Sequence, residues 1–341
     1  MESMFFPFLL IIFASIFQGS FGLGMKYMAP LKWESWWLVH VTIAMIILPI
    51  TWAFFVVPDL GTVLHNAFSD ASMQNVVFMA MFFGFLWGIG GILFGVSVPY
   101  IGLSLTMGIV MGLAGSIGAL IPLLQMENAT STPQFPYVIS GLAITLIGVA
   151  ITAKAGIDKD KLTSQASGEK SEIIKGITIA VACGILSALL NVGFVNAAPI
   201  ATLAIEMGAL DRNASLAAWV VVLIGAFIMN AGYAIFLLFK NKSWSNFKVP
   251  GSKKAFRWAI LASIFWFGAL GVYGQGAALI GPIGGVIGWP MLLGLSLIVS
   301  NFWAYRAGEW NGAKKPFNLL LIGLAVLIFA SIILGYSNSI I

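Results

Sequence analysis

Charged residues are scarce in this chain. They make up 9% of its 341 residues, whereas an ordinary soluble domain has about 25%. Hydrophobic residues make up 60%, and the mean hydropathy is +1.00. A soluble fold cannot bury that much apolar surface, so the composition excludes one. Most charges fall between apolar runs of about 20 residues, the length that crosses a bilayer as an α-helix. The composition therefore predicts an integral membrane protein.

Cysteine and histidine are also rare, and two common catalytic motifs do not occur. Cys183 is the single cysteine and there are two histidines, so an intramolecular disulfide is excluded and a metal site is not expected. No P-loop pattern GxxxxGK[ST] and no HExxH motif occurs, which argues against direct ATP use and against metalloprotease chemistry. We expect no cofactor and no enzyme activity. The basic residues are scattered among membrane loops, so we expect no nucleic-acid partner.

The apolar runs predict an all-α membrane protein with ten transmembrane helices. Lipid-exposed backbone must satisfy its hydrogen bonds internally, which favours helices, and a barrel would show alternating ten-residue segments. The predicted spans are approximately 5–24, 36–57, 77–97, 101–123, 136–154, 173–197, 215–239, 257–279, 283–304 and 317–337.

Lysine and arginine predict the orientation of these spans. Of the 17 basic residues, all but Arg212 lie in or beside the loops after spans one, five, seven and nine. Basic loops stay in the cytoplasm, so the odd-numbered loops should be cytoplasmic. Both termini should then face the periplasm or the outside.

The chain divides into two similar halves around a polar segment. The stretch 155–172, GIDKDKLTSQASGEKSEI, is the longest polar linker and separates five spans in 1–154 from five in 173–341. FLWGIGG (85–91) matches FWFGALG (265–271), and SGLA (140–143) matches IGLA (322–325), at offsets of 180 and 182. With five spans in each half, the second half enters the membrane in the opposite sense. We therefore expect two inverted five-helix repeats, a layout typical of secondary transporters.

Several segments carry a family resemblance. WGIGGILFGVSVPYIGLS (87–104), CGILSALLN (183–191) and the triplet Glu309-Trp310-Asn311 resemble the L-rhamnose–proton symporter family of the drug/metabolite transporter superfamily. The resemblance covers essentially the whole chain. It implies uptake of a small neutral sugar, L-rhamnose or a related deoxyhexose, by proton symport across the bacterial inner membrane. Two departures from the family pattern leave the sugar open: YGQGAALIGPIGGVIGWP (273–290) has fewer polar residues, and His40 replaces a small residue.

Sugar binding needs amides for the hydroxyl groups and an aromatic face for the ring. Polar side chains inside spans are expensive and either functional or helix-bridging. The expected substrate-binding residues are the amides Gln18, Asn191, Asn230 and Gln275 and the aromatics Trp87, Trp266 and Tyr273. For each amide, a hydrogen bond between helices is the competing interpretation, and it is the stronger one for Asn196 and Asn301 near span ends. Seven tryptophans near cytoplasmic ends predict an interfacial belt instead: Trp33, Trp36, Trp37, Trp244, Trp258, Trp303 and Trp310.

Proton coupling needs a titratable group that both sides of the membrane can reach. The candidates are His40, Glu34, Glu206 and Glu309, and no carboxylate lies clearly at mid-span. Histidine has an unperturbed pKa near 6.5, which suits a proton switch. A structural histidine and carboxylates paired with Lys32 or Arg306 are the competing interpretations.

Two other functions stay open at this point. A metabolite or drug exporter or exchanger of the same superfamily would fit the apolar spans eight and nine. A membrane-embedded enzyme or sensor would need a reactive cluster or a soluble domain, and the sequence contains neither. A duplicated ten-span chain can enclose its own cavity, so we expect a monomer in the lipid bilayer.

Overall fold

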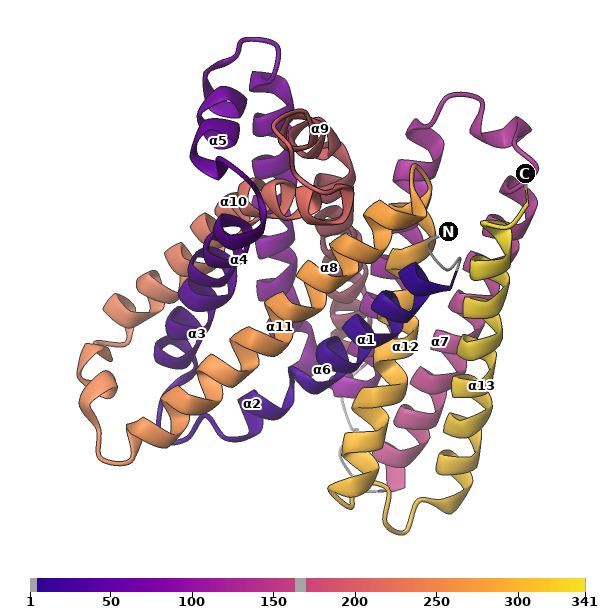
Figure 1. Cartoon of the computed structure of the whole chain (residues 1–341). Helices are drawn as coiled ribbons and strands as arrows, with labels where there is room; N and C mark the ends of the chain where they lie inside the picture. The colour runs from indigo at the N-terminus through magenta and orange to yellow at the C-terminus, as the bar shows by residue number, and fades with distance from the viewer. Residues whose placement is uncertain (1–4, 163–169, 341) are drawn as a thin grey trace. The chain divides into compact units, whose positions relative to one another are not determined.

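The computed structural model describes residues 5–162 and 170–340, so part of the predicted linker 155–172 lies outside the described residues. The described residues form helices and contain no strand, which confirms the all-α prediction. The α-helices are α1 (Phe6–Ser20), α2 (Leu23–Lys26), α3 (Trp33–Thr42), α4 (Leu48–Val56), α5 (Leu60–Ser69), α6 (Gln74–Gln125), α7 (Phe135–Leu162), α8 (Lys170–Asn196), α9 (Ala198–Glu206), α10 (Asp211–Lys240), α11 (Ser252–Ile280), α12 (Gly284–Arg306) and α13 (Lys314–Ser337) (Figure 1). A π-helix η1 (Ile43–Ile47) and two 3₁₀ turns, η2 (Ala129–Ser131) and η3 (Trp244–Lys248), complete the described elements.

Nine helical segments among the described residues are long and apolar enough to cross a membrane. One of them, α6, has 52 residues. At 1.5 Å per residue this would be roughly 78 Å long, far more than the ~30 Å hydrocarbon core requires. The sequence predicts two spans, 77–97 and 101–123, in this segment.

The chain reverses direction inside α6 at Gly102. Its backbone there has φ 78° and ψ 161°, a conformation that residues with a Cβ rarely adopt. The side chains of Ser97 and Thr106 meet at 2.8 Å between their hydroxyl oxygens. Residues nine apart on one continuous helix would be roughly 13.5 Å apart along its axis. The two arms of α6 therefore form a tight hairpin, and each arm corresponds to one predicted span.

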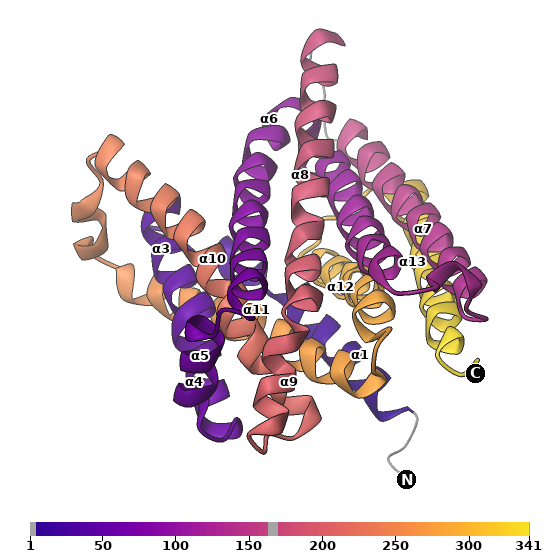
Figure 2. The ribbon, with the colours of Figure 1, turned by 90° about the horizontal axis from the view of Figure 1, so that it is seen from above.

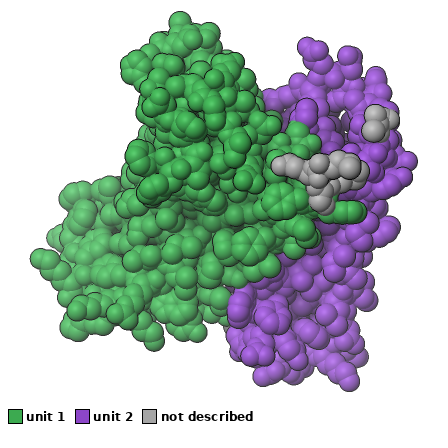
Figure 3. Space-filling view, in the orientation of Figure 1, with its two compact units in different colours: residues 1–88, 193–281 green, residues 89–192, 282–341 purple. Residues whose placement is uncertain are grey.

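The helices assemble into two compact units. Unit 1 consists of residues 1–88 and 193–281, and unit 2 consists of residues 89–192 and 282–341 (Figure 3). Each unit thus combines segments from both halves of the sequence. The predicted inverted symmetry of the halves stays a prediction.

In unit 1, α1 lies along α11, and α10 packs against α3 and α11 (Figure 1). Glycines allow the first arm of α6 to approach α10. A Cβ on Gly84 would fall inside the van der Waals distance of the Val222 carbonyl oxygen, and one on Gly225 would do the same at Met81. The two backbones therefore touch, as small residues permit between helices in lipid.

In unit 2, α7 and α13 run side by side, as both views of the ribbon show (Figures 1 and 2). Gly141 and Gly148 of α7 face Leu334 and Leu327 of α13, where an added Cβ would lie within 2.6–2.8 Å of the leucine side chains. The helix α7 continues to Leu162, so the first eight residues of the predicted linker are helical. Glycine again sets the distance between neighbouring helices.

Within each unit, odd-numbered loops lie close to one another; which side of the membrane they face stays a prediction. In unit 1, Asn246 of loop seven accepts a hydrogen bond from the backbone N–H of Lys32 in loop one, at 2.6 Å. In unit 2, the ammonium group of Lys159 lies 4.9 Å from the ring centroid of Trp310 in loop nine. The even-numbered loops contain two short helices that the sequence analysis did not anticipate, and these two, α5 and α9, contact each other in unit 1.

The glycine seam between α6 and α10 yields a direct test. We expect Gly225→Ala to lower thermal stability, because overpacking a tight contact costs about 1–3 kcal/mol. Gly232→Ala is the matched control on the same helix, since no described atom lies within 4 Å of a Cβ there. It should be neutral or slightly stabilising, because alanine favours helix. Thermal unfolding of the detergent-solubilised variants measures both; equal midpoints would contradict the packing account.

Candidate functional site

A cluster of aromatic rings surrounds His40 in unit 1. Trp36, Trp37 and His40 are spaced three and four residues apart on α3, so they share one helix face. The His40 ring stacks on Trp36, with centroids 5.3 Å apart and planes at 14°, and lies 5.1 Å from Trp37. Phe21 at 5.2 Å and Trp266 at 6.3 Å add rings from two other segments. His40 is fully buried among these four aromatic side chains.

Ser263 of α11 is the hydrogen-bond partner of the His40 ring. The Nδ1 of His40 and the Oγ of Ser263 are 3.0 Å apart. The serine hydroxyl has one proton and three acceptors in reach: this nitrogen and the carbonyl oxygens of Ala259 at 2.8 Å and His40 at 3.1 Å. When a carbonyl oxygen takes that proton, the serine oxygen accepts from the imidazole and Nδ1 carries the hydrogen. In that tautomer the Nε2 lone pair is the basic site of the ring.

Several buried polar atoms of unit 1 have no hydrogen-bond partner among the described residues. They include the Nε2 of His40, the Nε1 of Trp36 and the Oε1 of Gln18. Gln18 and Phe21 are three residues apart at the end of α1 and so share a helix face, which brings Gln18 toward the aromatic cluster. Buried polar groups are normally paired, so these atoms are free to form hydrogen bonds with a group that reaches them.

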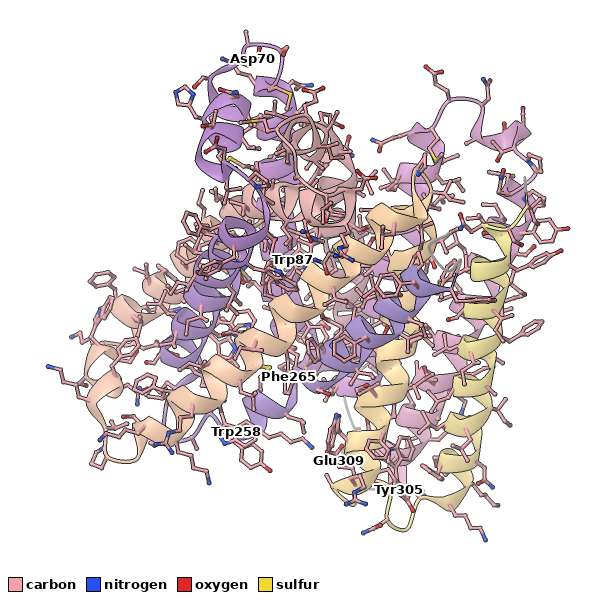
Figure 4. All side chains as sticks on the ribbon, viewed as in Figure 1. Asp70, Trp87, Trp258, Phe265, Tyr305 and Glu309 are labelled. Atoms are coloured by element: carbon pink, nitrogen blue, oxygen red, sulfur yellow. The ribbon has the colours of Figure 1, made fainter. Side chains whose placement is uncertain are left out.

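Trp87 and Trp266 form an aromatic pair beside this cluster. Their ring centroids are 5.5 Å apart and their planes are tilted by 34°; Trp87 lies in the first arm of α6 (Figure 4). Asn230 of α10 accepts a hydrogen bond from the Nε1 of Trp37 at 3.1 Å and donates to Ala226 at 2.9 Å. The Nδ2 of Asn230 lies 3.0 Å from where a Cβ of Gly88 would be. Glycine at 88 therefore makes room for this amide next to Trp87.

Tyr273 and Gln275 lie further along α11, away from the His40 cluster. Tyr273 is fully buried beside Phe194 and Trp219, whose rings stack at 4.4 Å. Gln275 donates to the Oδ1 of Asn213 at 3.1 Å. These two predicted binding residues share unit 1 with Gln18, Trp87, Asn230 and Trp266 but form a second group within it.

Asn191 is the one predicted binding residue in unit 2. It is fully buried, and its Nδ2 donates to the carbonyl oxygens of Gly118 at 2.8 Å and Gly285 at 3.0 Å. Both amide hydrogens are therefore used to join α8 to α6 and α12. This geometry is that of an interhelical cross-link, which the sequence analysis gave as the competing interpretation.

Glu34, one of the three predicted coupling carboxylates, is buried at the start of α3. It accepts hydrogen bonds from Ser243 at 2.6 Å and Asn241 at 3.1 Å. These bonds tie it to loop seven. Glu206 and Glu309 are exposed, at the end of α9 and in the loop after α12. Of the four coupling candidates, only His40 lies in the aromatic cluster.

A cavity of about 570 Å³ lies between α5 and α9 in unit 1, lined by Asp70, Thr202 and Glu206 among others. Asp70, at the tip of this region (Figure 4), accepts hydrogen bonds from the backbone N–H and the hydroxyl of Ser72, both at 2.8 Å. These bonds lower the pKa of that carboxyl group below its usual value, so it stays ionised at neutral pH.

The belt interpretation is wrong for Trp36 and Trp310. Trp36 is fully buried and Trp310 is 7% exposed, whereas Trp244 is 44% exposed. The spacing of Trp36 and Trp37 to His40 was the available signal, because residues one turn apart share a face. Nothing in the sequence indicated Ser263, which comes from a helix 223 residues away in the chain.

The second span is not a regular α-helix just beyond His40. The π-helix η1 (Ile43–Ile47) follows, and Pro49 lies at the start of α4. Proline lacks the N–H that would bond the carbonyl of the fourth residue before it, Met45. Such π-helical turns occur often at functional sites. The site thus adjoins a place where the helix backbone is locally rearranged.

Comparison with known proteins identifies the family. The model of the L-rhamnose-proton symport protein (RhaT) family matches residues 5–339. The chain is 29% identical over 319 residues to the "L-rhamnose-proton symporter" of Yersinia pestis (strain Pestoides F), covering 91% of both proteins. It is 27% identical over 321 residues to the protein of the same name from Mannheimia succiniciproducens, again with 91% of both covered. The chain therefore belongs to the L-rhamnose-proton symport family of multi-pass membrane transporters and is not an enzyme.

Proposed function

We propose that this protein imports a small neutral sugar, L-rhamnose or a related deoxyhexose, together with a proton by alternating access across the bacterial inner membrane. Family membership across residues 5–339 supports the reaction class. The observation in the structure that carries the proposal is the unit 1 cluster, which brings amides, paired tryptophans and a buried histidine together. These are the groups that a sugar–proton symporter needs.

The sugar would bind beside Trp87 and Trp266. The apolar face of a deoxyhexose can stack on an indole ring, because the ring is large, flat and apolar. Asn230 has a second amide hydrogen beyond the one given to Ala226, and Gln18 has a buried oxygen without a partner in the described residues. A hydroxyl group both donates and accepts, so it can pair with either. Tyr273 and Gln275 would contact the sugar further along α11. Asn191 would hold the helices of unit 2.

The proton would bind at the Nε2 of His40. With the Ser263 proton on the carbonyl oxygen of Ala259, the neutral ring would carry its hydrogen on Nδ1 and gain a proton at Nε2. Burial opposes the charged form, but the surrounding ring faces favour a cation. The groups that face His40 from α1, α3 and α11 are Phe21, Trp36, Trp37, Ser263 and Trp266, and none is charged. A sugar hydroxyl at Nε2 would couple proton binding to sugar binding, since an imidazolium needs a hydrogen-bond acceptor there.

The first prediction concerns sugar affinity. We expect Trp87→Ala and Asn230→Ala to raise the half-saturating concentration of labelled L-rhamnose in proteoliposomes. For Asn230→Ala, loss of one hydrogen bond costs about 0.5–1.5 kcal/mol, which is roughly twofold to twelvefold in affinity; Trp87→Ala removes the stacking surface of the ring instead. Asn75→Ala, an exposed asparagine near the start of α6, is the matched control. Unchanged kinetics in both site variants would remove these residues from the site. Lack of uptake by folded wild-type protein, with outward flux of other compounds, would favour an exporter.

The second prediction concerns proton coupling. We expect His40→Gln to lose stimulation of uptake by an inward proton gradient while it keeps sugar counterflow, which needs no net proton movement. Glutamine is neutral and still offers a donor to Ser263. His65→Gln is the control, because His65 is the other histidine and is exposed on α5. Gradient stimulation of wild-type size in His40→Gln would exclude His40 as the proton carrier.

The third prediction concerns orientation. The native Cys183 is buried, so a new exposed cysteine can report its side of the membrane. We expect an impermeant maleimide to label Ser72→Cys, in loop two, in intact spheroplasts. It should label Lys242→Cys, in loop seven, only after permeabilisation. The opposite pattern would place the odd-numbered loops and their basic residues outside.

A further inference from the structure

A second polar cavity lies within unit 2. Its volume is about 180 Å³, and its walls come from the second arm of α6, from α7, from α12 and from the loop after α12. Its polar lining residues are Ser104, Thr152, Lys159, Ser300, Asn301, Glu309 and Trp310. Drug-sized ligands occupy about 300–1,000 Å³. The size of this cavity therefore suits a molecule considerably smaller than a drug.

The cavity wall contains a buried donor without a partner. Trp310 is 7% exposed, and its Nε1 makes no hydrogen bond within the described residues. Its ring is held in place by Phe317, at 5.7 Å between centroids, and by the ammonium group of Lys159, at 4.9 Å. An unpaired buried N–H is destabilising. Trp310 is therefore a lining residue whose indole N–H would gain from a hydrogen-bond acceptor that reaches it.

The other polar groups of the wall supply both donors and acceptors. The Nδ2 of Asn301 and the hydroxyl of Ser300 both donate to the carbonyl of Leu297, at 2.8 and 3.1 Å, so each side chain keeps an oxygen that can accept. Ser104 makes no hydrogen bond in the part of the chain that the structure describes. Lys159 contributes a donor and Glu309 an acceptor. Lys159 also lies 3.9 Å from a carboxylate oxygen of Asp160, which is not itself part of the lining.

This combination selects the class of ligand. A wall with a net charge would favour an ion of the opposite sign, but the formal charges of its two charged lining residues, Lys159 and Glu309, cancel. A wall with mixed donors and acceptors instead matches hydroxyl groups, each of which donates and accepts. We propose that the unit 2 cavity is a second binding site for a neutral monosaccharide or similar polyol. The sugar class rests on the proposed function.

The position of the cavity gives this site a place in transport. It lies at the end of unit 2 where Lys159 of α7 meets Trp310 of loop nine (Figure 4, near Glu309). Both belong to the odd-numbered, basic loops that are predicted to be cytoplasmic. A sugar held here would occupy the cytoplasmic side of the protein, separately from one bound near Trp87. The second site would therefore act on the exit side of import.

Equilibrium dialysis of labelled L-rhamnose against the purified full-length protein tests the proposal. We expect wild-type protein to bind two sugars per chain. Trp310→Phe keeps the ring and removes the N–H, and Lys159→Gln removes the ammonium group. Each of these two variants should weaken sugar binding at the unit 2 site at least tenfold. Asn230→Ala should instead weaken sugar binding at the unit 1 site. Trp244→Phe and Lys154→Gln are matched controls at exposed positions, and thermal unfolding confirms that every variant is folded.

The outcomes separate this proposal from the proposed function. A single bound sugar in wild-type protein, lost in Asn230→Ala and kept in Trp310→Phe and Lys159→Gln, overturns the second site and leaves the symporter intact. Two sites that both survive Trp310→Phe and Lys159→Gln also overturn it. If folded wild-type protein binds none of a panel of neutral monosaccharides, both proposals fail. Selective loss of one site in both unit 2 variants supports it.

Discussion

The structure depends on how closely helix backbones approach one another. Hydrocarbon provides no hydrophobic drive between helices, so contact distance decides which helices pack. In unit 1 the carbonyl oxygens of Met81 and Val222 occupy the space of absent side chains at Gly225 and Gly84. The same seam continues to Gly88, where the missing side chain admits the amide of Asn230 beside Trp87. The glycines of this seam therefore allow both the close packing of α6 against α10 and the position of the Asn230 amide in the candidate site.

The aromatic cluster around His40 has two origins: the helical spacing of residues on α3, and the packing of α11 against α3. Trp36, Trp37 and His40 share a face because they are one turn apart on α3. Ser263 and Trp266 come from α11, which contacts the same face. The π-helix η1 lies just beyond His40, where Pro49 removes a backbone hydrogen bond. A buried base thus lies next to the least regular part of its own helix.

The spans, the family and the membrane class could be predicted from the sequence because they depend on local composition. Span 283–304 corresponds closely to Gly284–Arg306, whereas span 136–154 was predicted too short, because α7 continues to Leu162. Loop helices such as α5 were missed, although its buried Leu60, Val63 and Ala67 have helical spacing, because a short amphipathic helix gives a weak signal beside long spans. The hydroxyl of Ser263, the carbonyl groups that Asn191 cross-links and the cavity beside Trp310 could not be predicted. Each depends on contacts between segments tens to hundreds of residues apart, which a single sequence does not specify.

The composition of the two units has a consequence for biosynthesis. Residues 1–88 are made first, yet the rest of unit 1 is residues 193–281. The ribosome adds about 5–20 residues per second, so the first three spans wait seconds in the membrane before α10 and α11 reach them. Until then, Gly84 and Gly88 of α6 lack their neighbours on α10, and His40 of α3 lacks Ser263 and Trp266. Unit 2 is completed last, when α13 joins α7. Neither half of the chain can therefore mature before the other has been translated.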